Sequence, residues 1–262
     1  MISTFGIYFT TQWASFLAYR VVFFLYSMWA ILPPLIYLSV WSTVAGTGGI
    51  AGWSKGEFVA YYLTFMVVNH LAGSIEIHTA SWEIQQGEIS GRLLLPVHPG
   101  IRTLASNAGF KTIGMVVVVP SVLLLAALFR PEFHTTPGMV ALGVVATLLA
   151  VALQFLIGYT VALLSFWITR ADAADQLNMV LLFLLSGQVA PLVLLPDALR
   201  IAASGLPYRS MLSFPVEVIT GQLSWTGVVV GFALQAAWLV VAWFLMRFTW
   251  RRGVRRYAAV GG

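Results

Sequence analysis

The sequence contains no cysteine and few charged residues. Only 9% of its 262 residues are Asp, Glu, Lys or Arg, whereas about a quarter are charged in an ordinary soluble domain. The lack of cysteine excludes disulfides, thiolate metal sites and cysteine nucleophiles. The sequence also lacks a GxxxxGK[ST] phosphate-binding motif. If ATP drives the activity of this protein, another chain must bind the nucleotide.

Long apolar stretches make up most of the chain, which is 60% hydrophobic with a mean hydropathy of +0.89. A hydrocarbon layer of about 30 Å requires about 20 helical residues to cross it. The chain lacks the segments of about ten residues, alternating in polarity, that are typical of a membrane barrel. We therefore predict a single all-α integral membrane domain over residues 1–262. Its six transmembrane helices are expected at about 21–44, 57–80, 107–129, 137–168, 175–195 and 226–247.

Two segments next to these spans have a mixed character. Residues 1–20 repeat aromatic and aliphatic side chains at helical spacing, which predicts a helix in the membrane interface. An N-terminal extension of the first span is the alternative. Residues 196–224 are too polar to span and too apolar for a plain loop, so we predict a re-entrant extracytoplasmic segment. Pro33 and Pro34 should kink the first span.

Basic residues are distributed unequally between the loops on the two sides of this layout. With both termini in the cytoplasm, ten basic residues lie inside and four outside, which fits the positive-inside rule. The inside set is Arg20, Arg92, Arg102, Lys111, Arg170, Arg247, Arg251, Arg252, Arg255 and Arg256. The net charge of +5 is therefore explained by topology and by anchoring of the C-terminal tail to lipid headgroups, without nucleic acid.

The longest polar interruption runs from Trp82 to Lys111. Its charged residues include Glu83, Glu88 and Arg92, and each would cost at least about 2.5 kcal/mol inside hydrocarbon. We interpret this stretch as a cytoplasmic contact surface through which an outside component acts on the membrane helices. An ordinary solvated loop ending at a proline is the alternative.

Polar residues inside the predicted spans raise the question of a metal site, a proton relay or hydrogen bonds between helices. His70, Glu76 and His78 could suggest a metal site or proton relay, but Glu76 and His78 point about 160° apart on a helix. We therefore expect Glu76 and His78 to bond to neighbouring helices or to the interfacial helix. Asn178, Gln154, Gln188 and Gln235 should form hydrogen bonds between helices.

Three motifs resemble the membrane subunits of ABC-2-type ABC transporters, in particular bacterial six-helix permeases of about this length. The first is E-x-x-x-G-E-I-x-x-x-L-L-x-P-V, from Glu83 to Val97. The second is RADAADQ at 170–176. The third is SGQVAPLVLLP at 186–196, followed by Leu206-Pro207 and Gly221.

This resemblance implies a transport subunit rather than an enzyme. Two such permeases, identical or sister chains, would assemble with two separate ATPase subunits that bind ATP and Mg²⁺, in a bacterial cytoplasmic (inner) membrane. The substrate of the resulting exporter would be a hydrophobic or amphipathic small molecule. The permease itself would hold no cofactor or metal and would bind lipid but no nucleic acid.

The resemblance also implies roles for particular residues. Residues 82–106 would form the coupling region seated on the ATPase, with charged contacts from some side chains and an apolar anchor at 93–95. The implied coupling residues are Glu83, Gly87, Glu88, Arg92, Leu93, Leu94 and Pro96. The implied candidates for the substrate path between two permeases are Phe65, Asn69, Met179, Phe183 and Ser186.

Two other classes of function remain open. An ATP-independent channel or secondary carrier would work without an ATPase and would be expected to carry a ring of intramembrane charges. An intramembrane enzyme would need a converging acid/base or metal site, for which only Glu76 and the two histidines are available.

Overall fold

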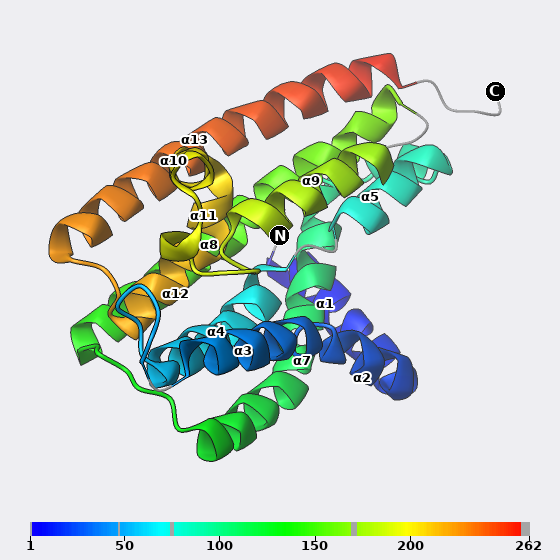
Figure 1. Ribbon diagram of the computed structural model, residues 1–262. Coiled ribbons are helices and arrows are strands. Elements are labelled where there is room, and N and C mark those ends of the chain that lie inside the picture. Colours follow the sequence, from blue (N-terminus) through cyan, green and yellow to red (C-terminus); the bar gives the residue numbers. More distant parts are fainter. Residues whose placement is uncertain (1, 47, 74–75, 169–171, 258–262) are drawn as a thin grey trace.

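The computed structural model describes residues 2–46, 48–73, 76–168 and 172–257, and all its regular elements are helical, which confirms the predicted all-α class (Figure 1). The α-helices are α1 (Ile2–Ala18), α2 (Arg20–Met28), α3 (Leu32–Ala45), α4 (Lys55–Ala72), α5 (Glu76–Gln85), α6 (Ile89–Leu93), α7 (Gly100–Phe129), α8 (Pro137–Leu163), α9 (Asp172–Leu185), α10 (Asp197–Gly205), α11 (Pro207–Met211), α12 (Ser213–Thr220) and α13 (Trp225–Arg256). Two short 3₁₀ turns are η1 (Leu164–Phe166) and η2 (Leu192–Leu194).

Five helical segments are long and apolar enough to cross a membrane. They are Arg20–Ala45, Lys55–Gln85, Gly100–Phe129, Pro137–Phe166 and Trp225–Arg256. These segments correspond to five of the six predicted spans: four extend beyond the predicted ends, and the fourth segment stops at Phe166 rather than 168. The third begins at Gly100 rather than 107, and the last continues to Arg256 rather than 247. Polar residues thus continue the helices at the ends of the spans.

The predicted fifth span at 175–195 is wrong as a continuous helix. Helix α9 contains 14 residues and ends at Leu185, so it is too short to cross a hydrocarbon layer alone. Gly187 follows with a φ of +81°, a left-handed conformation that ends a helix, and Pro191 then lacks a backbone donor. Among the described residues there are therefore five spanning-length segments, not six.

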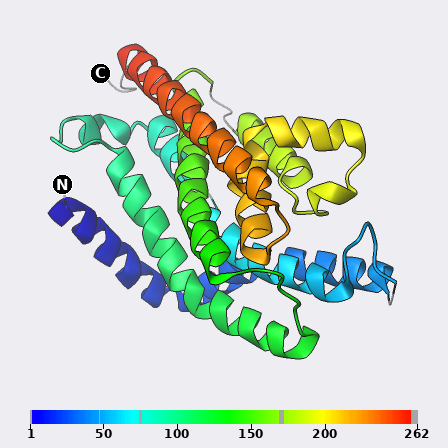
Figure 2. The same ribbon diagram turned by 90° about the vertical axis from the view of Figure 1, so that its left-hand side faces the viewer.

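The chain from α9 to α12 nevertheless connects opposite ends of the molecule. At one end, the hydroxyl of Ser165 in η1 lies 2.5 Å from that of Ser81 in α5. At the other end, Gln222, just before α13, donates to Glu57 at the start of α4 over 3.2 Å. In Figure 2, the start of α1 and the end of α13 lie toward the same end of the molecule as α5. A sixth crossing, made in pieces by this segment, remains a prediction.

The predicted proline kink of the first span is confirmed. The α2 helix ends at Met28 and α3 begins at Leu32, immediately before Pro33 and Pro34. Between them, the amides of Trp29, Ala30 and Ile31 each donate to the carbonyl three residues earlier. These tighter turns pair the carbonyls of Tyr26, Ser27 and Met28 at the break between α2 and α3.

Helix α4 lies at the centre of the fold. Almost all of its side chains are buried, including Phe58, Tyr61, Tyr62 and Phe65, because the helix is apolar on every face. Its start is fixed by a capping box, in which the Ser54 hydroxyl accepts from the Glu57 amide and the Glu57 carboxylate accepts from the Ser54 amide. Helices α3, α7, α8 and α12 all pack against it.

Aromatic side chains from α3 and α4 hold the loop that follows α9. The carbonyl of Val189 accepts from Trp41 Nε1 at 2.7 Å and from the Tyr62 hydroxyl at 3.0 Å. The carbonyl of Gly187 accepts from the Tyr61 hydroxyl at 3.0 Å. These bonds satisfy loop carbonyls in an apolar core, where an unpaired backbone group costs free energy.

The predicted re-entrant segment at 196–224 forms α10, α11 and α12, which fold back onto the protein. Helix α12 is buried against α8 and α4. Arg209 forms a 2.8 Å ion pair with Glu217. Gln235 of α13 donates to the carbonyls of Ala146 and Ser210, both at 2.9 Å, which confirms the hydrogen bond between helices predicted for this residue. Entry of this segment into the membrane remains a prediction.

The predicted N-terminal helix is present as α1, which lies along the first turns of α7. Trp13 Nε1 donates to the Thr112 hydroxyl at 3.2 Å, and the rings of Phe16 and Phe110 are 5.9 Å apart. The position of α1 in a membrane interface remains a prediction.

Replacing Gly187 with alanine should destabilise the fold. The new Cβ would meet the Tyr61 hydroxyl and lie 2.8 Å from Ser213 Cβ, in a left-handed backbone conformation. Overpacking and left-handed strain together predict a loss of about 2–4 kcal/mol, measurable as a lower thermal unfolding midpoint in detergent. The control is Gly205→Ala, where a Cβ meets no atom within 4 Å. Equal midpoints for the two variants would contradict the close packing of Gly187 against Tyr61 and Ser213.

Candidate coupling surface

The predicted coupling region is a compact helical element rather than a loop. Helix α5 ends at Gln85, a turn over 86–88 leads into α6, and a second turn leads into α7 at Gly100. Gly87 makes the first turn possible with a φ of +79°. In the second turn, His98 Nδ1 accepts from the Gly100 amide at 3.1 Å. Because α5 and α7 continue as spanning-length segments, this element connects two of them directly.

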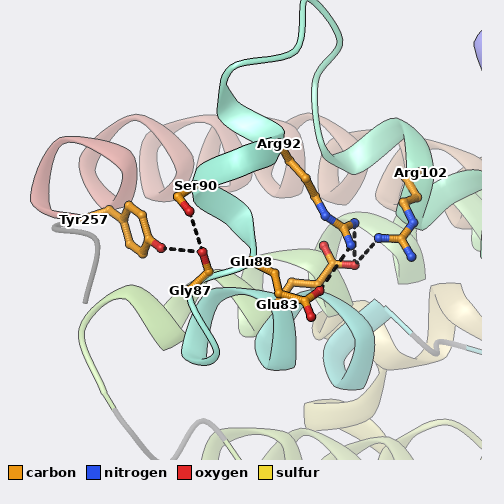
Figure 3. Close-up of polar contacts among 7 residues, drawn as sticks. All are labelled: Glu83, Gly87, Glu88, Ser90, Arg92, Arg102 and Tyr257. Atoms are coloured by element: carbon orange, nitrogen blue, oxygen red, sulfur yellow. Dashed lines mark hydrogen bonds and ion pairs between the residues drawn. The ribbon is translucent and has the colours of Figure 1, made fainter. Parts of the chain in front are cut away.

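A buried carboxylate fastens the three helices together. The Glu83 side chain is 5% exposed, and its Oε1 lies 2.6 Å from Arg92 Nη1 of α6 and 3.1 Å from Arg102 Nη1 of α7 (Figure 3). Arg92 also lies 3.6 Å from the Glu88 carboxylate. Ion pairs to two guanidinium groups fix the relative positions of the three side chains. One residue of α5 thus links α6 and α7.

The inner face of this element is apolar. Ile84 and Ile89 are buried with Ala80 against Tyr159 of α8 and Met246 of α13. Apolar burial of this kind stabilises at roughly 25 cal/mol per Å². The α5–α6 unit is therefore held by packing on its inner face and by ion pairs along its edge, which makes it stiff.

His98 contributes a neutral acceptor to the second turn. Its ring lies 4.4 Å from the ring of Trp250 and 6.5 Å from that of Tyr159. Partial burial lowers the pKa of His98 below its usual range, which favours the neutral imidazole at pH 7. A neutral ring can accept the Gly100 amide proton, whereas an imidazolium ring cannot.

The outer face presents apolar side chains without cover. Leu94 is 87% exposed and Leu95 is 52% exposed just after α6, while the Glu88 side chain at the start of α6 is 46% exposed. Pro96 is also exposed. Two adjacent large aliphatic side chains left uncovered on a polar turn form a candidate contact surface for another protein. We call Glu88, Leu94, Leu95 and Pro96 the outer patch.

The implied coupling residues therefore divide into two groups. Glu88, Leu94 and Pro96 lie on the outer patch, whereas Glu83, Arg92 and Leu93 face inward or sideways and hold the element together. Gly87 shapes the turn. Glu83 is not a surface contact, because Arg92 and Arg102 enclose its carboxylate. The polar stretch also ends earlier than predicted, since Lys111 is buried within α7.

Arg102 and Tyr257 are not among the coupling residues that the family resemblance implies. Arg102 is the second partner of Glu83, and the Tyr257 hydroxyl donates to the Gly87 carbonyl at 3.1 Å. A signal for Tyr257 was available in the spacing of Met246, Trp250, Gly253 and Tyr257. This spacing places them on one helical face of the basic tail.

The five candidate path residues do not share one surface in this chain. Phe65 and Ser186 are fully buried, and the Phe65 ring stacks 6.2 Å from that of Tyr61. Asn69 is half-buried in α4. Met179 and Phe183 are 49% and 39% exposed on one face of α9. Their role in a substrate path remains a prediction.

The polar groups at the ends of α5 and α9 form contacts between helices. His78 Nε2 lies 3.8 Å from the Asp175 carboxylate, which joins α5 to α9 as predicted for His78. The side chains of Glu76 and Asp172, and the whole of Arg170 in the RADAADQ motif, lie outside the described part of the structure. Among the residues searched, no three His, Asp or Glu side chains form a group that could hold a metal ion.

Removing the Glu83 charge should weaken the coupling element. Glu83→Gln leaves Arg92 and Arg102 without their shared carboxylate, and we expect a loss of about 3 kcal/mol of stability, the low end for breaking a buried pair. The control is Asp197→Asn, whose pair with Arg200 is exposed and should contribute less than about 1 kcal/mol. Thermal unfolding in detergent compares them. A Glu83→Gln midpoint no lower than that of Asp197→Asn would refute the fastening role.

Comparison with known proteins agrees with this architecture. A family model described as "ABC-2 family transporter protein" matches residues 14–261, nearly the whole chain. No curated protein sequence matches the chain.

Proposed function

Because the chain belongs to the ABC-2 family of transporter proteins and is a multi-pass membrane protein, we propose that it is the permease subunit of an ATP-driven exporter. The energy would come from a separate ATPase subunit that binds ATP and Mg²⁺. The observation that carries this proposal is the outer patch, an exposed apolar turn on a stiff element between two spanning-length helical segments.

The geometry suggests how force would reach the membrane. An ATPase can drive membrane helices only through an element that makes different contacts in its two states. Leu94 and Leu95 would be buried on the partner, and Glu88 would add a charged contact. Displacement of α6 would then move α5 and α7 together, because Glu83 binds both Arg92 and Arg102.

A second permease subunit, identical or a sister chain, would complete the transport path. The α9 helix exposes Met179, Val180, Phe183 and Leu184, a broad apolar face beside α3. In an assembly, Met179 and Phe183 would line a path for a hydrophobic or amphipathic molecule, with Asn69 nearer the core. Phe65 and Ser186 would support this wall from behind.

The charge distribution supports an orientation in a bacterial inner membrane with both termini in the cytoplasm. Exposed arginines gather at the end of α13 that lies beside α5 and α6: Arg247, Arg251, Arg252, Arg255 and Arg256. Such a cluster favours the cytoplasmic side and its anionic lipids. The outer patch at the same end would then face the cytoplasm, where a soluble ATPase can reach it.

Gentle purification followed by mass spectrometry tests the assembly. We expect the chain to bring with it a soluble protein that contains a GxxxxGK[ST] motif, and a second permease if the pair is made of sister chains. Transport in reconstituted vesicles should require ATP. Recovery of the chain alone, in a form that moves solute without ATP, would replace this proposal with a channel or secondary carrier.

Replacing Glu88 and Leu94 together with alanine should detach or uncouple the ATPase while the permease remains folded. Both side chains are exposed, so the fold loses little, whereas a contact surface loses its apolar anchor and a charge. Loss of the anchor predicts at least about a tenfold fall in affinity for the ATPase, measured by pull-down and by ATP-dependent transport. The matched control is Lys55→Ala with Val229→Ala, an exposed charge and aliphatic side chain at the opposite end. Unchanged transport in the Glu88/Leu94 variant would remove the outer patch from its proposed role.

A further inference from the structure

The end of α13 is tied to the turn between α5 and α6. The Tyr257 hydroxyl donates to the Gly87 carbonyl at 3.1 Å, across 170 residues of sequence (Figure 3). The same carbonyl accepts from the Ser90 hydroxyl at 2.7 Å. The Ser90 bond is local to the turn, whereas the Tyr257 bond joins the turn to another spanning-length helix.

Packing keeps the last turns of α13 close to this element. A Cβ on Gly253 would lie 2.8 Å from Cγ of Phe166, so only glycine allows the helix to approach so closely. The Tyr257 ring lies 5.8 Å from the Phe166 ring, and Trp250 contacts His98 of the second turn. The end of α13 therefore rests on η1 and on the coupling element.

The hydroxyl of Tyr257 adds a hydrogen bond that the packing of its ring does not require. A phenylalanine would make the same ring contact with Phe166 but could not reach the Gly87 carbonyl with a donor. Gly87 is the residue whose left-handed φ of +79° sets the direction of the turn. The bond therefore joins α13 to the backbone at the residue that sets the direction of the α5–α6 turn.

Helix α13 extends from this contact to the far end of the molecule. It packs along α8, and Gln235 in its interior donates to carbonyls of α8 and of Ser210 in α11. Near its start, a Cβ on Gly231 would overlap the ring of Phe214 in α12. A shift of the α13 end would thus reach the short helices α11 and α12 through packed contacts.

We propose that Tyr257 is a positioning residue that ties α13 to the coupling turn, so that α13 moves together with α5 and α7 when the partner ATPase acts. This inference rests on the proposed transport function. It adds a third moving helix and a route from the ATPase to the extracytoplasmic end of the chain.

The first test compares Tyr257→Phe with Ser90→Ala in the assembled transporter. Each variant removes one donor to the Gly87 carbonyl, but only the first breaks the connection to α13. We expect Tyr257→Phe to lower the amount of substrate moved per ATP hydrolysed by about two- to tenfold, the range for one net hydrogen bond. ATPase binding should stay near wild type, and the thermal midpoint should fall no further than in Ser90→Ala, which also loses one hydrogen bond. Ser90→Ala should keep the wild-type ratio.

The second test measures the connection directly. Because the natural chain has no cysteine, Gly91→Cys on α6 and Arg252→Cys on α13 can carry the only two spin labels. Arg252 is exposed, and a Cβ at Gly91 meets no atom within 4 Å. In the otherwise wild-type assembly, the distance between labels should keep one narrow distribution when ATP hydrolysis is trapped. In the Tyr257→Phe variant, trapping ATP hydrolysis should broaden or shift the distribution of distances between the labels.

The two tests separate this inference from the proposed function. If transport needs ATP and the ATPase binds, but Tyr257→Phe keeps the wild-type ratio and the wild-type label distances, the Tyr257 connection is refuted and the transport function stands. If no ATPase binds the wild-type chain, the transport proposal fails, and the inference fails with it.

Discussion

The buried Glu83 carboxylate is the contact on which the coupling element depends. It sits between two guanidinium groups, so it can be ionised in a place where an unpaired charge would be costly. Its partners belong to α6 and α7, and Glu83 itself belongs to α5. This one residue converts a chain reversal between two spanning-length helices into a stiff unit, and it leaves Leu94 and Leu95 on the outer side.

A related constraint acts at the centre of the fold, where backbone groups cannot remain unpaired. The loop after α9 has no regular secondary structure over 186–191, yet it lies against the core. Trp41, Tyr61 and Tyr62 supply donors to its carbonyls. Non-helical backbone is tolerated at such depth only where protein surrounds it, and the buried aromatic face of α4 provides that environment. Helix α4 therefore stabilises the non-helical chain that follows the short α9 helix.

The two ends of the molecule consequently differ in character. At one end, ion pairs and aromatic contacts join α5, α6, α7 and α13 into one element with an exposed apolar turn. At the other end, Glu57 accepts from both Ser54 and Gln222, and links the start of α4 to the chain entering α13. The long helices α8 and α13 run between these ends. The proposed ATP-driven permease would use this arrangement, because force would enter at one end and access would change at the other.

The sequence by itself determined the all-α class, the proline kink, the polar segment between the second and third spans, and the resemblance to the ABC-2 family. Each of these follows from local composition or spacing, such as Pro33-Pro34 or the run from Glu83 to Val97. Only the tertiary structure decided that Glu83 faces inward while Leu94 faces outward, because that depends on where Arg102 and Tyr159 lie in space. It also decided that the predicted fifth span stops at Leu185 and that Tyr257 reaches Gly87. Hydropathy averages over a window, so it registers neither a single left-handed glycine nor a hydrogen bond between residues 170 positions apart.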